Sequence, residues 1–136
     1  MKFPYVNDWG FFMPIIPVTL RRGESSVRAE ALVDSGAASC IFNAQFATAL
    51  GIVDIEAGAQ VQFQGISGGP LNGFVHTVTL EIGGNRFHDV DIAFSREMPD
   101  NAVNILGQEG FFELFPVKFT LRKQEIELMA GGGSKA

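Results

Sequence analysis

Apolar and polar residues alternate in short segments along most of this chain, and glycine-rich turns separate the segments. Successive side chains of a β-strand point to opposite faces, so this alternation predicts strands with one buried face. Residues 27–33, 74–82, 90–94 and 117–121 are clear examples. We expect roughly eight short strands. A sheet that closes on itself has no unpaired edge strands, so closure would protect the edges of so many short strands. The predicted fold is therefore all-β, a closed or nearly closed β-barrel.

One or two short helices are expected within this barrel. Asn43 is a favourable N-cap residue, and Gly51 is a typical stop for the helix that would follow. The residues predicted to share the apolar face of this helix are Phe46, Ala49 and Leu50. A second helix is predicted over residues 107–115, where Pro116 would end it.

The length and composition fit one globular domain. The chain has 136 residues, of which 46% are hydrophobic and 18% charged. Residues 1–12 are expected to form an N-terminal arm, and the glycine-rich residues 131–136 a flexible tail. The net charge of −5, without a cluster of Lys or Arg, argues against nucleic acid as a partner. No apolar run approaches the roughly 18 residues of a membrane span.

Cys40 is the only cysteine, so no intrachain disulfide can form. Together with the lack of a signal-peptide pattern, this predicts a cytoplasmic location. A thiol nucleophile paired with His76 or His88 is one alternative, but Cys40 lies in an apolar segment and is predicted to be buried and inert. His88, Asp89 and Asp91 form a loose set without a further ligand pair, so no metal or other cofactor is predicted.

A carboxylate directly follows the predicted strand 27–33. It belongs to the tripeptide Asp34-Ser35-Gly36, in which Gly36 permits a tight reversal that would aim Asp34 out of the barrel. An isolated Asp-Ser-Gly is usually a surface turn, because all three residues are turn formers. Two later features favour a functional site instead. A glycine-rich hairpin tip follows at residues 65–69, and an apolar segment, 104–107, ends in glycine.

In this order and spacing, the motifs resemble those of the retropepsin-like aspartic peptidases, over about residues 13–128. The family's hydrophobic-hydrophobic-Asp-Thr/Ser-Gly-Ala loop is matched by residues 32–37, which implies catalytic Asp34 supported by Ser35, Gly36 and Ala37. The family's glycine-rich flap is matched by residues 64–73, with substrate-binding positions at Gly65, Ile66, Ser67, Gly68 and Gly69. Its hydrophobic-hydrophobic-Gly segment is matched by Ile105, Leu106 and Gly107. The resemblance implies a retropepsin-like barrel.

The resemblance also implies a mechanism. An aspartic peptidase uses two carboxylates that share one proton, so that one activates water and the other polarises the scissile carbonyl. This chain has one Asp-Thr/Ser-Gly motif, so the second carboxylate is expected from a second copy across a twofold axis. Ser35 would bond across that interface. The prediction is a homodimeric aspartic endopeptidase that cleaves peptide or protein substrates beneath the flap.

Two other functions fit the same barrel. One is a dimerisation or peptide-binding module with little turnover, although such a module has no need of Asp34. The other is a monomeric carrier of a small apolar ligand. For the enzyme, Ala37 offers no hydroxyl that would favour the ionised carboxylate, so activity is expected to extend toward mildly acidic or neutral pH. Trp9, Phe11 and Phe12 are expected to dock on the barrel or on the partner subunit.

Overall fold

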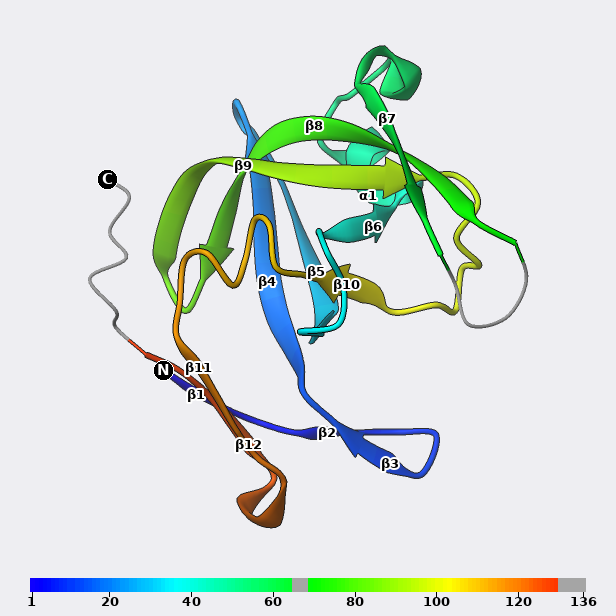
Figure 1. Cartoon of the computed structure of the whole chain (residues 1–136). Helices are drawn as coiled ribbons and strands as arrows, with labels where there is room; N and C mark the ends of the chain where they lie inside the picture. Colours follow the sequence, from blue (N-terminus) through cyan, green and yellow to red (C-terminus); the bar gives the residue numbers. More distant parts are fainter. Residues whose placement is uncertain (65–68, 130–136) are drawn as a thin grey trace.

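The computed structural model of the chain describes residues 1–64 and 69–129. Six strands form a closed ring, because the strand that begins the main sheet also pairs with one near its other end (Figure 1). Around the ring they are β4 (Ile15–Arg22), β5 (Ser25–Val33), β10 (Asn104–Leu106), β6 (Ile41–Asn43), β9 (Asn85–Ser95) and β8 (Leu71–Ile82). The predicted closed β-barrel is confirmed.

Apolar side chains from the ring strands fill the barrel. In β4, Ile16, Val18 and Leu20 are buried, whereas the residues between them are half-buried, as the alternation in sequence predicts. Phe42 on β6 and Phe94 on β9 are among the largest fully buried side chains. Burial of such surface contributes roughly 25 cal/mol per Å² and is the main force that holds the ring closed.

Within the described residues, one α-helix, α1 (Ala44–Ala49), follows β6 and lies against β5 and β9. Asn43 caps this helix as predicted, because its side-chain oxygen accepts the Gln45 N–H at 2.9 Å. The chain leaves the helix through Gly51, whose φ of +79° lies in the left-handed region that favours glycine.

The face that α1 turns toward the barrel differs in part from the prediction. Leu50 is buried as expected, but Phe46 is only half-buried and Ala49 is exposed. Ala44 and Ala47 are the buried helical residues instead. Their small side chains let the helix axis approach the strands closely, which leaves the larger Phe46 at the rim.

The second predicted helix does not form, because residues 107–115 fold into successive turns. Gly110 has a φ of +93°, a value outside the range of a right-handed helix, and it interrupts the segment. The phenylalanines still turn inward. Phe111 is fully buried, and its ring centroid lies 5.3 Å from that of Phe112 and 5.5 Å from that of Phe115.

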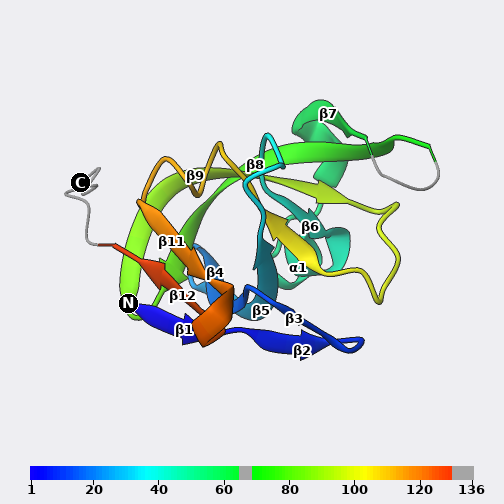
Figure 2. The ribbon, with the colours of Figure 1, turned by 60° about the horizontal axis from the view of Figure 1, so that its bottom comes forward.

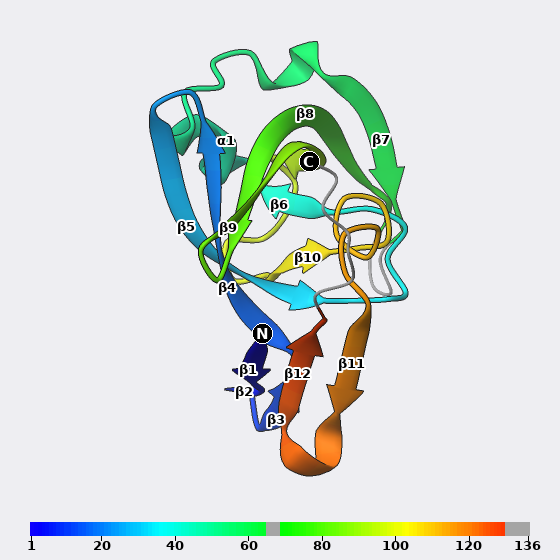
Figure 3. The same cartoon turned by 90° about the vertical axis from the view of Figure 1, so that its left-hand side faces the viewer.

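Two smaller sheets lie outside the ring, at one end of the barrel (Figures 2 and 3). The first is antiparallel and contains, in order, β1 (Lys2–Pro4), β12 (Glu125–Leu128) and β11 (Val117–Thr120), with the 3₁₀ turn η2 (Leu121–Lys123) between β11 and β12. The second is a hairpin of β2 (Val6–Asp8) and β3 (Phe11–Met13). The N-terminal arm predicted over residues 1–12 therefore contributes strands to both sheets.

The remaining strand, β7 (Ala59–Phe63), follows the short 3₁₀ turn η1 (Ile55–Ala57) and pairs with the first half of β8. Strand β8 is long enough to serve two purposes. Its first half forms the β7–β8 hairpin, and its second half closes the ring against β4. Among the described elements, no helix has the length and apolarity needed to cross a membrane.

Candidate active site

Asp34 stands where β5 ends, at a point fixed by two neighbouring segments. Strand β10 runs parallel to β5 and pairs Leu106 with Val33. Beyond this pair, the Asp34 N–H donates to the Leu106 carbonyl oxygen at 3.0 Å, while the Val33 N–H donates to the Pro14 carbonyl oxygen at 2.9 Å. These two backbone hydrogen bonds fix the position of Asp34, whose side chain is half-buried.

The turn that follows orients the carboxylate. The Gly36 N–H donates to Asp34 Oδ1 at 2.9 Å, and the Ala37 N–H donates to the Asp34 carbonyl oxygen at 3.1 Å. A charged acceptor bonded to a backbone donor is held firmly in direction. Ser35 and Gly36 are exposed and Ala37 is half-buried, so the four predicted residues form one compact turn. It is here called the catalytic turn (residues 34–37), after the role predicted for Asp34.

Gln108 holds the catalytic turn on the side of β10. Its backbone N–H donates to the Ala37 carbonyl oxygen at 2.9 Å, and its side-chain Nε2 donates to the Ser35 carbonyl oxygen at 2.8 Å. The next residue, Glu109, donates its N–H to the Ala38 carbonyl oxygen at 2.9 Å. Sequence reasoning did not single out Gln108. The signal available was its place directly after the apolar-apolar-Gly segment.

The predicted Ile105-Leu106-Gly107 segment lies beside the catalytic turn. Leu106 is buried in the barrel core, and Ile105 points to the opposite face of β10. At Gly107 the segment meets the turn so closely that a Cβ atom would overlap the Ser39 carbonyl and lie 2.8 Å from the Ala37 carbonyl oxygen. Glycine is therefore required here by space, and its absence of a side chain brings the two backbones together.

Asn104 fixes β10 between its two neighbours in the ring. Its side chain is buried, donates to the Glu30 carbonyl oxygen at 3.0 Å and accepts the Asn43 N–H at 2.9 Å. Both polar ends of a buried amide are thus satisfied, as a stable core requires. The two hydrogen bonds of Asn104 therefore fix the position of β10, and with it the position of Leu106 beside the catalytic turn.

The predicted flap falls on the β7–β8 hairpin, whose antiparallel register pairs Phe63 with Leu71. Four of the predicted substrate-binding residues, Gly65, Ile66, Ser67 and Gly68, lie outside the described residues. Gly69 is described and exposed. The flanking strands therefore form the expected hairpin stem.

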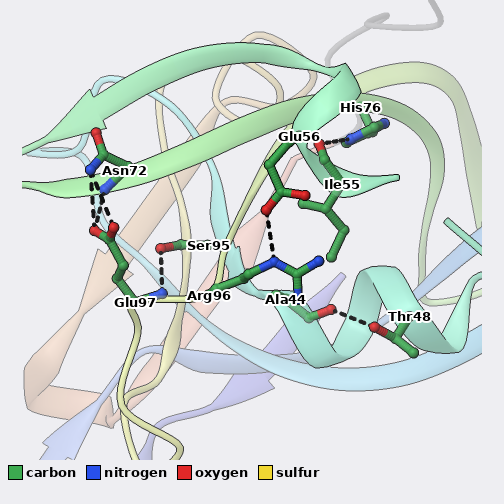
Figure 4. A network of polar contacts seen from close by, with 9 residues as sticks. All are labelled: Ala44, Thr48, Ile55, Glu56, Asn72, His76, Ser95, Arg96 and Glu97. Carbon is green, nitrogen blue, oxygen red and sulfur yellow. Dashed lines mark hydrogen bonds and ion pairs between the residues drawn. The ribbon is translucent and has the colours of Figure 1, made fainter. Parts of the chain in front are cut away.

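Glu97 ties this stem to the loop that follows β9 (Figure 4). It accepts the Asn72 backbone N–H at 2.8 Å through Oε1 and the Asn72 side-chain amide at 3.2 Å through Oε2. The Glu97 N–H in turn donates to Ser95 Oγ at 3.1 Å. The bonds from the Asn72 backbone and side chain lower the pKa of Glu97, because they favour the ionised carboxylate.

An apolar wall lies between the hairpin stem and the ring. It forms a cluster separate from the barrel core, with buried Ile41, Ala93 and Met98 and the half-buried residues Val61, Phe63, Leu71, Val75 and Ile105. Ile105 belongs to the same segment that holds the catalytic turn, so this apolar surface begins beside Asp34 and continues to the stem of the hairpin.

The aspartyl protease family matches residues 16–109, which include the catalytic turn and the Ile105-Leu106-Gly107 segment. The chain belongs to the aspartyl protease family. A retropepsin-like aspartic protease from Rickettsia conorii is similar in fold, with a TM-score of 0.66 and 19% identity, over 94% of this chain and 89% of that one. EIAV protease complexed with the inhibitor HBY-793 is a weaker match, with a TM-score of 0.48 and 22% identity, over 71% of this chain and 82% of that one. No curated protein matches the sequence.

The family match confirms the predicted family, and the similarity to the Rickettsia conorii structure confirms the retropepsin-like fold. The geometry of this aspartyl protease brings Asp34, Ser35, Gly36 and Ala37 together with Gly107. The apolar wall lies between these residues and the stem of the β7–β8 hairpin.

Cys40 is not placed for nucleophilic chemistry in this aspartyl protease. Its side chain is fully buried, and burial raises the pKa of the thiol to about 11. The Gly107 N–H lies 3.4 Å from its sulfur, so the thiol packs behind the catalytic turn. His76 Nε2 lies 2.7 Å from the Ile55 carbonyl oxygen (Figure 4), and His88 Nδ1 lies 3.0 Å from Thr79 Oγ1. Both histidines are therefore engaged elsewhere.

This protease also has a groove of about 620 Å³. Its walls come from β2, from the middle of β5, from the start of α1 and from the loop before β10, and Asp34 is not among the lining residues. Across residues 1–64 and 69–129, no cluster of three His, Cys, Asp or Glu side chains is arranged to hold a metal ion.

Proposed function

We propose that this chain is one half of a homodimeric aspartic endopeptidase, in which Asp34 of each copy supplies one carboxylate of the catalytic pair. The observation that carries the proposal is the position of Asp34. In a member of the aspartyl protease family, it ends a barrel strand at a turn that is bonded to it through Gly36 and held by Gln108.

The need for a second copy follows from the count of motifs. The chain has one Asp-Ser-Gly and no Asp-Thr-Gly, whereas water activation in this class requires an acid and a base of the same residue type. A twofold axis beside the catalytic turn would place Asp34 opposite its copy. Ser35, exposed at the outer side of the turn, is then positioned to bond to the partner's loop.

In the proposed reaction, the ionised carboxylate takes a proton from water while the water oxygen attacks the scissile carbonyl carbon. The protonated carboxyl group gives its proton to the carbonyl oxygen, which produces a tetrahedral diol. The amide nitrogen then accepts the proton that came from water, and a diol hydroxyl returns its proton to the other carboxylate. The C–N bond breaks, and the shared-proton state of the pair is restored without a covalent intermediate.

The substrate we propose is an extended peptide with apolar side chains. The flap hairpin offers backbone groups that can pair with such a peptide as an added strand. The apolar wall beneath the hairpin stem, which includes Leu71 and Ile105, would receive its side chains. Asp34 does not line the groove of about 620 Å³, so the proposed substrate cleft is a different one, which a second copy would complete.

Cleavage of a peptide library between pH 4 and 7 tests the enzyme, with Asp34→Asn as the inactive variant and Asp54→Asn as the control. Asp54 is an exposed aspartate outside the catalytic turn. We expect activity in the parent and control, loss in Asp34→Asn, and inhibition by a pepstatin-like compound. Binding of peptides without cleavage would instead identify a peptide-binding module. Equal cleavage by parent and Asp34→Asn would end the assignment.

A mixing experiment tests whether two copies share one site. When excess inactive Asp34→Asn chain is added to the parent, exchange of subunits produces heterodimers with a single aspartate. Parent activity is expected to fall as the variant is added, and the Asp54→Asn chain is expected to produce no such loss. Activity that stays constant would show that each chain carries a complete site.

A further inference from the structure

Glu97 contacts the stem of the β7–β8 hairpin where β8 leaves its pairing with β9. The antiparallel pairing of these two strands ends at Phe74 and Phe94, and β9 itself ends at Ser95. Two residues beyond Phe74, the Asn72 N–H donates to Glu97 Oε1 at 2.8 Å (Figure 4). A side-chain carboxylate therefore takes the place that the carbonyl of a neighbouring strand would have.

Glu97 also determines the direction of a chain of amide hydrogen bonds. An ionised carboxylate can only accept, and Glu97 Oε2 accepts from Asn72 Nδ2 at 3.2 Å. The side-chain oxygen of Asn72 is then turned toward β7. There it accepts from Gln60 Nε2 at 3.1 Å and from Gln62 Nε2 at 3.2 Å. Both strands of the stem are thus bonded to one carboxylate, directly or through Asn72.

The loop that carries Glu97 is fixed to the ring. Ser95 is fully buried, and its Oγ accepts the Glu97 N–H at 3.1 Å. One residue after Glu97, the Met98 carbonyl oxygen accepts Asn43 Nδ2 at 3.3 Å, and Asn43 is the buried N-cap of α1. Glu97 therefore has rigid support, and the hairpin stem is the part that its hydrogen bonds hold in place.

Residues of the apolar wall lie on both sides of this contact. Leu71 precedes Asn72 and Met98 follows Glu97, and both belong to the apolar wall. The catalytic turn is held by other hydrogen bonds, on the side of β10. A change at Glu97 would therefore displace the apolar wall and leave the catalytic turn in place.

We propose that Glu97 is a positioning residue for substrate binding, which holds the hairpin stem where the apolar wall fits the side chains of an extended peptide. This inference rests on the proposed endopeptidase function. Loss of the carboxylate should weaken substrate binding more than it slows the chemical step, because Asp34 is positioned independently. Gln108, which bonds the catalytic turn, should show the opposite split between KM and kcat.

The charge of Glu97 provides a second signature. The side chains that face it from β7 and β8 are amides, and the hydrogen bonds from Asn72 lower the pKa of Glu97 because they favour the ionised form. The contact is therefore present at neutral pH and is lost only as the pH falls below the ordinary pKa of glutamate. The titratable side chains next along these elements are His76, which lies 2.7 Å from the Ile55 carbonyl oxygen, Arg96, which pairs with Glu56 at 2.8 Å, and Asp100.

Glu97→Gln is the decisive variant, because it removes the charge and one acceptor at nearly constant shape. At pH 7 we expect KM to rise roughly 3- to 10-fold, as when the binding-competent fraction falls to about a third to a tenth. The Ki of a pepstatin-like inhibitor should rise by the same factor, with kcat changed less than about twofold. Toward about pH 3 the parent loses its own carboxylate, so the two KM values should converge.

Glu56→Gln is the matched control. It makes the same chemical change and breaks the ion pair with Arg96, on the loop that carries Glu97, but it leaves the contact with Asn72 intact. We expect it to keep the parent's KM at every pH. Asn72→Ala removes the side-chain amide and should reproduce part of the Glu97→Gln effect. The double variant Asn72→Ala/Glu97→Gln should add little to it, because the two residues act as a unit.

A Glu97→Gln protein with the parent's KM at pH 7 overturns the inference even if cleavage is normal. So does a KM difference that persists unchanged in acid, or an equal rise in Glu56→Gln, since general loosening of the loop would then explain both. If the parent cleaves nothing, the proposed function fails by itself. Amide exchange at Asn72 then decides the inference. Exchange that is faster in Glu97→Gln at pH 7 and equal to the parent's in acid supports the contact, and unchanged exchange overturns it.

Discussion

Replacing Gly107 by alanine should displace the catalytic turn, because the added Cβ would press on the backbone of the turn from the side of β10. A Cβ at this position would overlap the Ser39 carbonyl and stand 2.8 Å from the Ala37 carbonyl oxygen, whereas carbon–oxygen contacts in proteins are rarely shorter than about 3.3 Å. The two backbones must therefore separate by at least about 0.5 Å. No flexible side chain can yield at either contact, because both obstructing groups are backbone.

Gly107→Ala is expected to lower both the stability of the protein and its catalytic efficiency. Overpacking of this kind costs about 1–3 kcal/mol of unfolding free energy, and the rigid surroundings place Gly107→Ala toward the upper end, near a 10 °C fall in Tm. Displacement of Asp34 lowers the catalytic efficiency. Because a misplacement of about 1 Å can reduce a rate by about 100-fold, we expect kcat/KM to fall by roughly 10- to 100-fold.

Far-UV circular dichroism during thermal unfolding measures the stability, since the single, exposed Trp9 is a weak reporter of the core. Gly69→Ala is the matched stability control. A Cβ there would meet no described atom within 4 Å, so its effect on unfolding should stay within about 0.5 kcal/mol. A Gly107→Ala protein with the Tm and kcat/KM of the parent would refute the idea that this close contact positions Asp34.

Four further predictions concern Gln108, Ala37, Cys40 and Glu97. Gln108→Ala removes the 2.8 Å bond to the Ser35 carbonyl and should lower kcat more than it raises KM; Gln108→Glu should be worse in steady-state assays, because a carboxylate cannot donate. Ala37→Ser should shift the acidic limb of the pH–rate profile to lower pH, and an unchanged limb would count against this. With a thiol pKa of about 11 and full burial, Cys40 should react with iodoacetamide at pH 8 only after unfolding, as mass spectrometry can show. Because the pKa of Glu97 is lowered in the fold, its contribution is present above the unfolded-state pKa and lost as pH falls through the folded-state value. Glu97→Gln should therefore speed amide exchange at Asn72 at neutral pH and change little in acid.

Much of this architecture is encoded in local patterns. Alternation along residues 27–33 predicts strand β5 correctly because one face of that strand is buried. The Asp-Ser-Gly turn is equally visible, since a polar turn after an apolar strand is a local feature. Closure of the ring is harder to predict from the sequence, because the contact between β4 and β8 joins residues about 60 apart along the chain.

The errors share one physical cause. A helix over residues 107–115 is plausible from its phenylalanine spacing, yet Gly110 adopts a left-handed conformation and the segment turns so that its backbone can bond the catalytic turn. Gln108 escaped notice for the same reason, because its side-chain bond to Ser35 joins positions far apart in sequence. Tertiary contacts decided both, and no local pattern records them.

The catalytic turn is supported unequally on its two sides, and this asymmetry bears on the function. Toward β10 it is bonded by the Leu106 carbonyl and by both donors of Gln108, and the backbone of Glu109 bonds the next residue, Ala38. On its outer side, Ser35 and Gly36 are exposed. A carboxylate that works as one of a pair needs rigid support on one side. Its other side must be open, because the second carboxylate must approach to about 3 Å. The exposed front of the turn therefore supports the proposal that a second copy supplies the other carboxylate.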